Sequence, residues 1–172
     1  MWGQKVGSAM RDAEKKIVER YALAAECARL RGEGKRIVFT NGCFDLMHAG
    51  HATYLQFARE QGDVLAVGLN TDASVKRYKG EKRPIVDERN RARMMAALEC
   101  VDYVTWFDED EPRALIAELQ PDVLVKAEDW AHYVSGRDVV EARGGKVVLA
   151  PMVAGLSTTA VIERVVRAYG GG

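Results

Sequence analysis

Short apolar runs alternate with longer helix-like segments along this chain, and this alternation limits its possible folds more than any other feature. Five runs are rich in Val, Ile and Leu without a clean polar alternation, as is typical of strands covered on both faces. We expect these strands at residues 36–40, 63–69, 102–107, 122–126 and 146–150. Helices are expected between and after them, at 50–61, 88–99, 111–119, 137–143 and 157–169. This order predicts a Rossmann-like α/β three-layer sandwich around a five-stranded, mostly parallel sheet.

The 172 residues suit a single domain with a helical addition at its N-terminus. Residues 11–31 have the pattern of one helix, with Ile17, Tyr21, Ala24 or Ala25, and Ala28 along one face. The glycines of the segment 32–35 are expected to end this helix. We therefore predict a helical extension at 1–34, an α/β domain at 35–169 and a flexible tail at 170–172.

Charge and cysteine content exclude several classes of partner. Lys plus Arg equals Asp plus Glu, at 25 each, so no overall field attracts the chain to nucleic acid or to an anionic membrane. The three cysteines, Cys27, Cys43 and Cys100, form no CxxC pair, which argues against a zinc site or a disulfide framework. The N-terminus shows no apolar signal region, and no run of 18 apolar residues occurs. We expect a cytoplasmic protein.

The segment after the first expected strand, TNGCFDLMHAGH (residues 40–51), holds two of the three histidines. If a helix begins near His48, then His48 and His51 share one face of its first turn. A helix N-terminus offers free N–H groups and partial positive charge, which bind anions and keep imidazoles neutral. Gly50 lets a phosphate approach the backbone, and two histidines alone make a poor zinc site. In such a sheet, ligands bind at the carboxyl ends of the strands, so we favour a phosphate site over incidental surface histidines.

Two other segments suit phosphate binding, although each also has a purely structural interpretation. Residues 76–93 hold eight basic and three acidic residues; they predict either a solvated loop and helix face or a flexible loop that closes over phosphates. The segment GLSTTAVI (155–162) predicts a helix start with Ser157 as the N-cap. The clustered hydroxyls and N–H groups there would also suit a triphosphate tail.

These motifs resemble a known family. HAGH (48–51) looks like the HxGH signature of the nucleotidyltransferases, FTNGCFDLMHAGHATYL is similar to the opening of their cytidylyltransferase-like branch, and LSTTAVI resembles their second signature. The segments GLNTDASVKRYKG, ALECVDYV and PDVLVKAEDW further resemble the heptose 1-phosphate adenylyltransferases, and the resemblance runs from about Lys35 to Arg167. Relatives usually have KGGDY where this chain has KAEDW at 126–130. No sugar kinase accompanies the domain, so we expect the stand-alone form.

The resemblance implies transfer of AMP from ATP to D-glycero-D-manno-heptose 1-phosphate, giving ADP-heptose and pyrophosphate for the lipopolysaccharide inner core. The substrates would be small molecules, Mg²⁺ would accompany ATP without a metal site of the protein's own, and we expect a homo-oligomer. His48, His51 and Lys79 would be catalytic, while Asp45, Lys79 and Arg83 would bind the sugar phosphate, with Asp45 equally interpretable as a helix cap. The nucleotide site would comprise Thr40, Asn41, Gly42, Phe44, Gly50, Arg91, Asp129, Trp130, Ser157, Thr158 and Thr159.

Two alternatives remain open at this stage. A cytidylyltransferase for a small phosphorylated alcohol such as glycerol 3-phosphate would use the same fold, and Trp130 resembles the DDW motif of those enzymes. Their arginine before the STT motif is absent here, where residues 152–155 read MVAG. A non-catalytic nucleotide sensor is the second alternative. Dehydrogenase and P-loop kinase are disfavoured because neither GxGxxG nor GxxxxGK[ST] follows the first strand.

Overall fold

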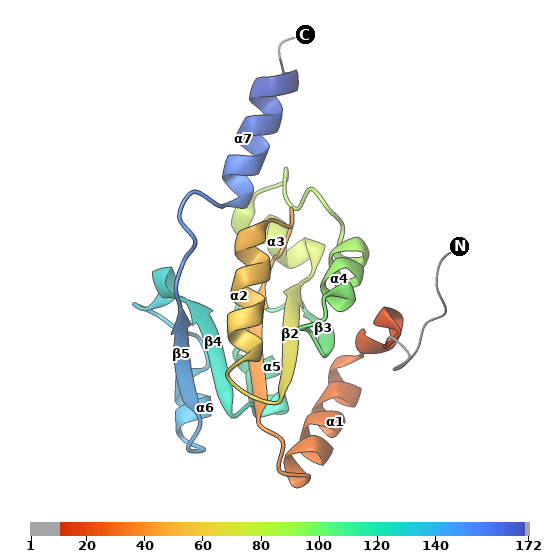
Figure 1. Ribbon diagram of the computed structural model, residues 1–172, viewed down its shortest axis with the longest axis vertical. Helices are drawn as coiled ribbons and strands as arrows, with labels where there is room; N and C mark the ends of the chain where they lie inside the picture. The colour runs from red at the N-terminus through yellow and green to blue at the C-terminus, as the bar shows by residue number, and fades with distance from the viewer. Residues whose placement is uncertain (1–10, 171–172) are drawn as a thin grey trace, which may run out of the picture.

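A computed structural model describes residues 11–170 and contains one five-stranded sheet (Figure 1). Its strands lie in the order β3-β2-β1-β4-β5, and every pairing between them is parallel. They are β1 (Ile37–Gly42), β2 (Val64–Asn70), β3 (Tyr103–Phe107), β4 (Val123–Ala127) and β5 (Lys146–Ala150). All five predicted strands are confirmed to within two residues, and the sheet is wholly rather than mostly parallel.

Helices cover both faces of this sheet, as the prediction of a three-layer sandwich requires. On one face, α2 (Ala49–Arg59) and α4 (Glu88–Ala97) pack against the side chains of β1 and β2 that point toward them. On the other face lie α1 (Arg20–Gly32), α5 (Arg113–Leu119) and α6 (Arg137–Glu141). Successive strand residues alternate between the two layers, so Val38 belongs to the first core and Ile37 and Phe39 to the second.

The N-terminal segment differs from its prediction. Instead of one helix over 11–31, a 3₁₀ turn (Ala13–Lys16) and α1 are separated by an extended stretch in which Ile17 pairs with Val104 of the edge strand β3. The amide of Val18 donates to the carbonyl of Val104, so strand-type hydrogen bonds replace the helical ones there. These contacts with the edge strand account for the break.

The predicted apolar face of this segment was only partly right, since Ile17 and Ala24 pack against the cores but its other members do not. Tyr21 is 79% exposed, and Ala25 and Ala28 face solvent as well. The buried stripe consists of Leu23, Cys27 and Leu30, whose larger side chains gain more from burial than alanines do. Residues 1–10 of the expected extension and 171–172 of the expected tail lie outside the described residues. Within residues 11–170, no helix is both long and apolar enough to cross a bilayer.

The position of the site follows from how β1 pairs with its two neighbours. β1 pairs with β2 over six residues, from Ile37 to Gly42, but its pairing with β4 ends at Phe39 and Leu124. Beyond this point β1 and β4 diverge. The chain order reverses between these strands, since β2 and β3 extend the sheet on one side and β4 and β5 on the other. Ligands of doubly wound sheets bind at such a switch point.

Two helices frame this end of the sheet. The first, α3 (Asp72–Lys79), was missed by sequence reasoning, which treated its residues as part of a basic loop. Its buried residues are only Ser74 and Val75, so the apolar periodicity was too weak to detect. The side chain of Thr71 accepts from the amide of Ser74, an N-cap that could have signalled the helix start. The second, α7 (Thr158–Tyr169), projects beyond the carboxyl ends of the strands (Figure 1).

Candidate active site

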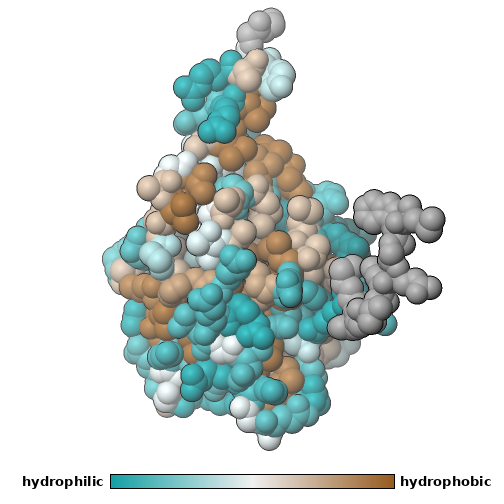
Figure 2. Space-filling view, in the orientation of Figure 1, coloured by the Kyte–Doolittle hydropathy of each residue, from teal (hydrophilic) through white to brown (hydrophobic). Residues whose placement is uncertain are grey.

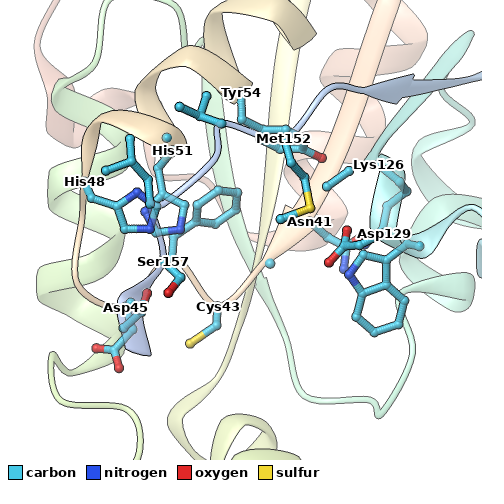
Figure 3. A pocket seen from close by; sticks show the side chains of 18 of the residues that line it. Asn41, Cys43, Asp45, His48, His51, Tyr54, Lys126, Asp129, Met152 and Ser157 are labelled. Atoms are coloured by element: carbon cyan, nitrogen blue, oxygen red, sulfur yellow. Dashed lines mark hydrogen bonds between the residues drawn. The ribbon is translucent and has the colours of Figure 1, made fainter. Parts of the chain in front are cut away.

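A cavity of about 340 Å³ lies at the carboxyl ends of β1 and β4. In Figure 3, the histidines and Asp45 lie at one side of this pocket and Lys126 and Asp129 at the other. Thirteen of the sixteen predicted site residues line it, and these are Asn41, Gly42, Phe44, Asp45, His48, Gly50, His51, Lys79, Arg83, Asp129, Trp130, Ser157 and Thr158. The topology therefore brings together segments that are far apart in the sequence.

The two histidines occupy the first turn of α2, as predicted. His48 is the N-cap residue with an extended backbone, and its ring stacks on that of His51 with the centroids 3.9 Å apart. Burial lowers the pKa of His48, and burial, assisted by His48 and Lys79, lowers the pKa of His51 to about 4. Both rings are therefore neutral near pH 7 and can each donate one N–H.

The buried Nδ1 atoms of His48 and His51 find no hydrogen-bond partner among the described residues, and the same holds for Nη2 of Arg83. A proton on a buried Nδ1 would thus lack an acceptor, which favours the neutral tautomer that carries its proton on Nε2. All three side chains line the same pocket. With this tautomer, the donors left for a ligand are the Nε2–H groups of the two histidines and Nη2 of Arg83, which suit an anion rich in acceptor oxygens.

Phe44 and Gly50 support the histidine rings. Phe44 adopts a left-handed backbone (φ 44°), which is unusual for a bulky residue and places its ring edge-to-face on His51 at 5.3 Å. A Cβ atom at Gly50 would lie 3.0 Å from Cε1 and Nδ1 of His48. Glycine at this position therefore leaves room for the His48 ring. This role adds to the one predicted from the sequence, in which Gly50 lets a phosphate approach the backbone.

Asp45 is not the cap of α2, because His48 holds the N-cap position; its contact with the sugar phosphate stays a prediction. Its carboxylate has no exposed surface and accepts hydrogen bonds from the amides of Ile85 (2.9 Å) and Val86 (2.8 Å) and from Nε of Arg83 (2.6 Å). Burial alone would raise the pKa of Asp45, but these three donors outweigh it and lower the pKa. Asp45 therefore fastens the loop between α3 and α4 against the pocket.

This loop, residues 80–87, presents the basic groups predicted for phosphate binding. Lys79 ends α3, and Gly80 follows with φ 87°, a backbone conformation that favours glycine. Arg83 is neutralised by Asp45, whereas Lys79 has no carboxylate within 4.0 Å in the described part of the chain. Lys79 therefore keeps its positive charge for a ligand.

The opposite edge of the pocket is the start of α7. Ser157 is its N-cap, as predicted, with its hydroxyl accepting from the amide of Ala160 at 3.1 Å. Ser157 and Thr158 line the pocket, but Thr159 is exposed and lies outside the lining. Consecutive helical residues point about 100° apart, so Thr159 cannot share the direction of Thr158.

The structure also places Thr40 and Arg91 outside the pocket. Thr40 is fully buried within β1, with its hydroxyl 2.6 Å from that of Tyr54. Arg91 is 1% exposed; its guanidinium donates to the carbonyls of Cys43, Asn70 and Val86 and to the carboxylate of Asp72. The donors of Arg91 are thus directed at the backbone of the site and at Asp72, and neither side chain faces the pocket; a part for these residues in nucleotide binding stays a prediction.

Sequence reasoning missed several pocket residues, notably Tyr54, Lys126 and Met152. The pocket position of Tyr54 could have been inferred, since it lies one helical turn after His51 and on the same face of α2. Lys126 ends an apolar strand, and charged residues at such positions are candidates for a site. Met152 lies on the loop after β5 and carries no comparable signal.

The carboxylates that line the pocket are those of Asp45 and Asp129. Asp45 is engaged by its three donors, and across residues 11–170 no group of three or more His, Cys, Asp or Glu side chains could hold a metal ion. Magnesium prefers phosphate, carboxylate and water oxygens. In proteins it is usually held by one or two carboxylates together with substrate phosphates and water.

Fold and pocket together define an α/β domain with an HxGH motif at its switch point. Residues 39–164 match the family model described as cytidylyltransferase-like, so the chain belongs to this family. It is 54% identical over 166 residues to the bifunctional protein HldE of Citrifermentans bemidjiense, and 54% identical over 160 residues to that of Geobacter metallireducens. These matches cover 96% and 92% of this chain but 34% and 33% of the relatives, so the chain spans about a third of their length.

A solved structure is similar as well. The lipopolysaccharide core biosynthesis protein from Thermoplasma volcanium GSS1 superposes with a TM-score of 0.58 at 27% sequence identity. The match covers 70% of this chain and 98% of that one. The similarity thus extends over nearly the whole of that smaller protein.

Proposed function

We propose that this chain is a heptose 1-phosphate adenylyltransferase, which transfers AMP from ATP to D-glycero-D-manno-heptose 1-phosphate. The observation that carries the proposal is the neutral His48–His51 pair at the N-terminus of α2, in a pocket shared with Lys79 and the start of α7. The relatives named bifunctional protein HldE and the similar lipopolysaccharide core biosynthesis protein support the assignment to heptose chemistry.

The chemistry needs no covalent intermediate on the protein. An oxygen of the sugar phosphate attacks the α-phosphorus of ATP in line, the bond between the α-phosphorus and the bridging oxygen breaks, and pyrophosphate leaves with the bonding electrons. The nucleophile is already ionised, so no general base is required. Catalysis comes from alignment of two anionic substrates and from stabilisation of the charge that develops on the transferred group.

Each wall of the pocket has a role in this scheme. His48 and His51 donate Nε2–H to oxygens of the α- and β-phosphates, while Ser157, Thr158 and the free amides at the start of α7 receive the leaving pyrophosphate. Lys79 binds the sugar phosphate, and Arg83 contributes through Nη2, which no described residue occupies. Magnesium enters with ATP and is held by phosphates and water.

The nucleoside would occupy the opposite side of the pocket, toward Asn41, Asp129 and Trp130. The indole of Trp130 is half exposed at the pocket wall, where a base could stack on it. We also propose a homo-oligomer, because α7 exposes Val165, Val166 and Tyr169, and Figure 2 shows apolar surface on this projecting helix.

The proposed reaction is tested by pyrophosphate release in the presence of Mg²⁺. ATP and CTP would each be combined with both anomers of heptose 1-phosphate and with glycerol 3-phosphate. Release only with ATP and one heptose anomer is expected. Release with CTP and glycerol 3-phosphate would instead assign the chain to the cytidylyltransferases for small alcohols. Nucleotide binding without release in any combination would indicate a sensor.

A further inference from the structure

Lys126 is a pocket cation with no role in the scheme above. It lies at the carboxyl end of β4, where β4 has already separated from β1. Its ammonium donates to Oδ1 of Asn41 on β1, 3.2 Å away, and so spans the crevice at the switch point. The Trp130 ring lies 5.3 Å from the same nitrogen. Both neighbours are uncharged.

The charge of Lys126 is only weakly balanced by the protein. Among the described residues, no carboxylate lies within 4.0 Å of its nitrogen, in contrast to Arg83 and Arg91, whose guanidinium groups are paired. The titratable groups near it are Asp129 on the adjoining 3₁₀ turn (Glu128–Trp130) and Tyr54 on α2. Burial lowers the pKa of Lys126 to about 8, although Asp129 opposes the shift. A desolvated cation of this kind is stabilised by an anionic ligand.

We propose that Lys126 binds a phosphate of the nucleotide, exchanging its hydrogen bond to Asn41 for one to a phosphate oxygen. The inference rests on the proposed function and specifies how the nucleotide substrate is bound. Lys79 stands beside Arg83 at the loop between α3 and α4, whereas Lys126 belongs to the wall formed by β4 and Trp130. Each of the two unpaired lysines of the pocket thus binds one anionic substrate: Lys79 binds the sugar phosphate and Lys126 binds the nucleotide.

A second consequence concerns protons. A lysine with a pKa near 8 is about half neutral at pH 8, and a bound phosphate shifts it fully to the charged form. Binding of ATP should therefore take up about half a proton at pH 8 and much less at pH 6. If Lys126 only packed against the walls of the crevice, proton uptake would not depend on the phosphates of the ligand.

The test is equilibrium binding of MgATP and of adenosine by calorimetry, at pH 6 and pH 8, in buffers with different ionisation enthalpies. No sugar phosphate is present, so the result does not depend on turnover. Lys126→Met should weaken MgATP binding about 10- to 100-fold, the range of one charge-assisted hydrogen bond, and change adenosine binding less than twofold. Proton uptake should disappear in this variant.

Two further variants complete the experiment. Lys126→Arg keeps the charge, so it should recover part of the MgATP affinity while showing no proton uptake, because arginine does not titrate in this range. Lys146→Met, on the exposed first residue of β5, is the matched control and should bind like the wild type. Thermal unfolding would verify that all variants are folded.

Several results would overturn the inference. These are unchanged MgATP affinity in Lys126→Met, an equal loss of adenosine affinity, persistent proton uptake without Lys126, or no binding of MgATP by the wild type. Failure of the proposed function gives a different result, namely normal MgATP binding that depends on Lys126 but no pyrophosphate release with heptose 1-phosphate.

Discussion

Replacement of Asp45 by Asn is the perturbation whose effect can be worked out most fully from the structure. Four contacts reach the Asp45 carboxylate: the Ile85 amide contacts both oxygens, the Val86 amide contacts Oδ1 and Nε of Arg83 contacts Oδ2. An asparagine keeps one acceptor oxygen and places an N–H₂ group where the other was. At least one donor then faces another donor.

The expected cost follows from the burial of this pair. The Asp45 side chain is 0% exposed and that of Arg83 is 15%, so solvent cannot replace the lost acceptor. A hydrogen bond to a charged group contributes about 1.5–3 kcal/mol, and breaking a buried ion pair costs about 3–5 kcal/mol. We expect about 3 kcal/mol, expressed as local opening of the loop at 80–87 rather than global unfolding, because this loop lies at the surface.

Hydrogen exchange measures that opening directly. A loss of about 3 kcal/mol corresponds to roughly 100-fold faster exchange of the Ile85 and Val86 amides. The KM for the sugar phosphate should rise, since Lys79 and Arg83 lose their placement, while the Kd for ATP should change little. The control is Asp87→Asn at the N-cap of α4, an exposed position where asparagine caps nearly as well.

The pH dependence provides an independent check. The pKa of Asp45 is lowered in the folded protein, so the stabilisation is complete above the unfolded value near 4 and is lost as the pH falls through the lower, folded value. Wild-type protection of Ile85 and Val86 should therefore decline in acid, and the decline should be absent in Asp45→Asn. Unchanged exchange at neutral pH together with an unchanged KM would refute the role assigned to Asp45.

Three other substitutions test the remaining walls of the site. His48→Ala should lower turnover about 10²–10³-fold, as loss of a transition-state donor does elsewhere, with unfolding by urea unchanged; an unaltered rate would remove His48 from the chemistry. Lys79→Ala should raise the KM for the sugar phosphate about 10-fold or more without weakening ATP binding. Lys82→Ala, on the loop that follows α3, should leave both unchanged. Equal losses for both substrates would contradict the assignment of Lys79 to the sugar phosphate. Arg91→Met should destabilise the fold by about 3 kcal/mol in urea, because four acceptors lose their donor, and exposed Arg89→Met should not.

Local sequence patterns were sufficient for the strands and for the first turn of α2. The central strands β1, β2 and β4 are compact runs rich in buried Val, Ile or Leu, and parallel crossovers leave little freedom in how such runs pair. The histidine pair could be located because a strand, a turn and a helix follow one another within a few residues. α3 was missed because it buries Val75 and Ser74 but no large apolar stripe.

The structural roles of Asp45 and Arg91 could not be predicted, because these roles depend on contacts between segments that are distant in the sequence. Asp45 meets its donors 38 to 41 residues later in the chain, and Arg91 reaches a carbonyl 48 residues earlier. From the sequence alone, a charged residue beside a phosphate site could equally well contact the ligand or hold the surrounding backbone in place. Only the tertiary structure shows that Asp45 secures the loop and that Arg91 secures the backbone just after β1 and at the end of β2.

The crevice between β1 and β4 connects the histidine side of the pocket with its proposed nucleotide side. Where the pairing ends, the hydroxyl of Tyr54 donates to the carbonyl of Val125 at 3.0 Å and contacts the hydroxyl of Thr40. A strand partner would otherwise have to satisfy that carbonyl, so Tyr54 allows the crevice to exist without an unpaired buried group. Tyr54 lies one turn after His51 on α2. The helix that carries the histidine pair therefore also lines the crevice spanned by Lys126, and a change that shifts α2 should alter nucleotide binding and turnover together.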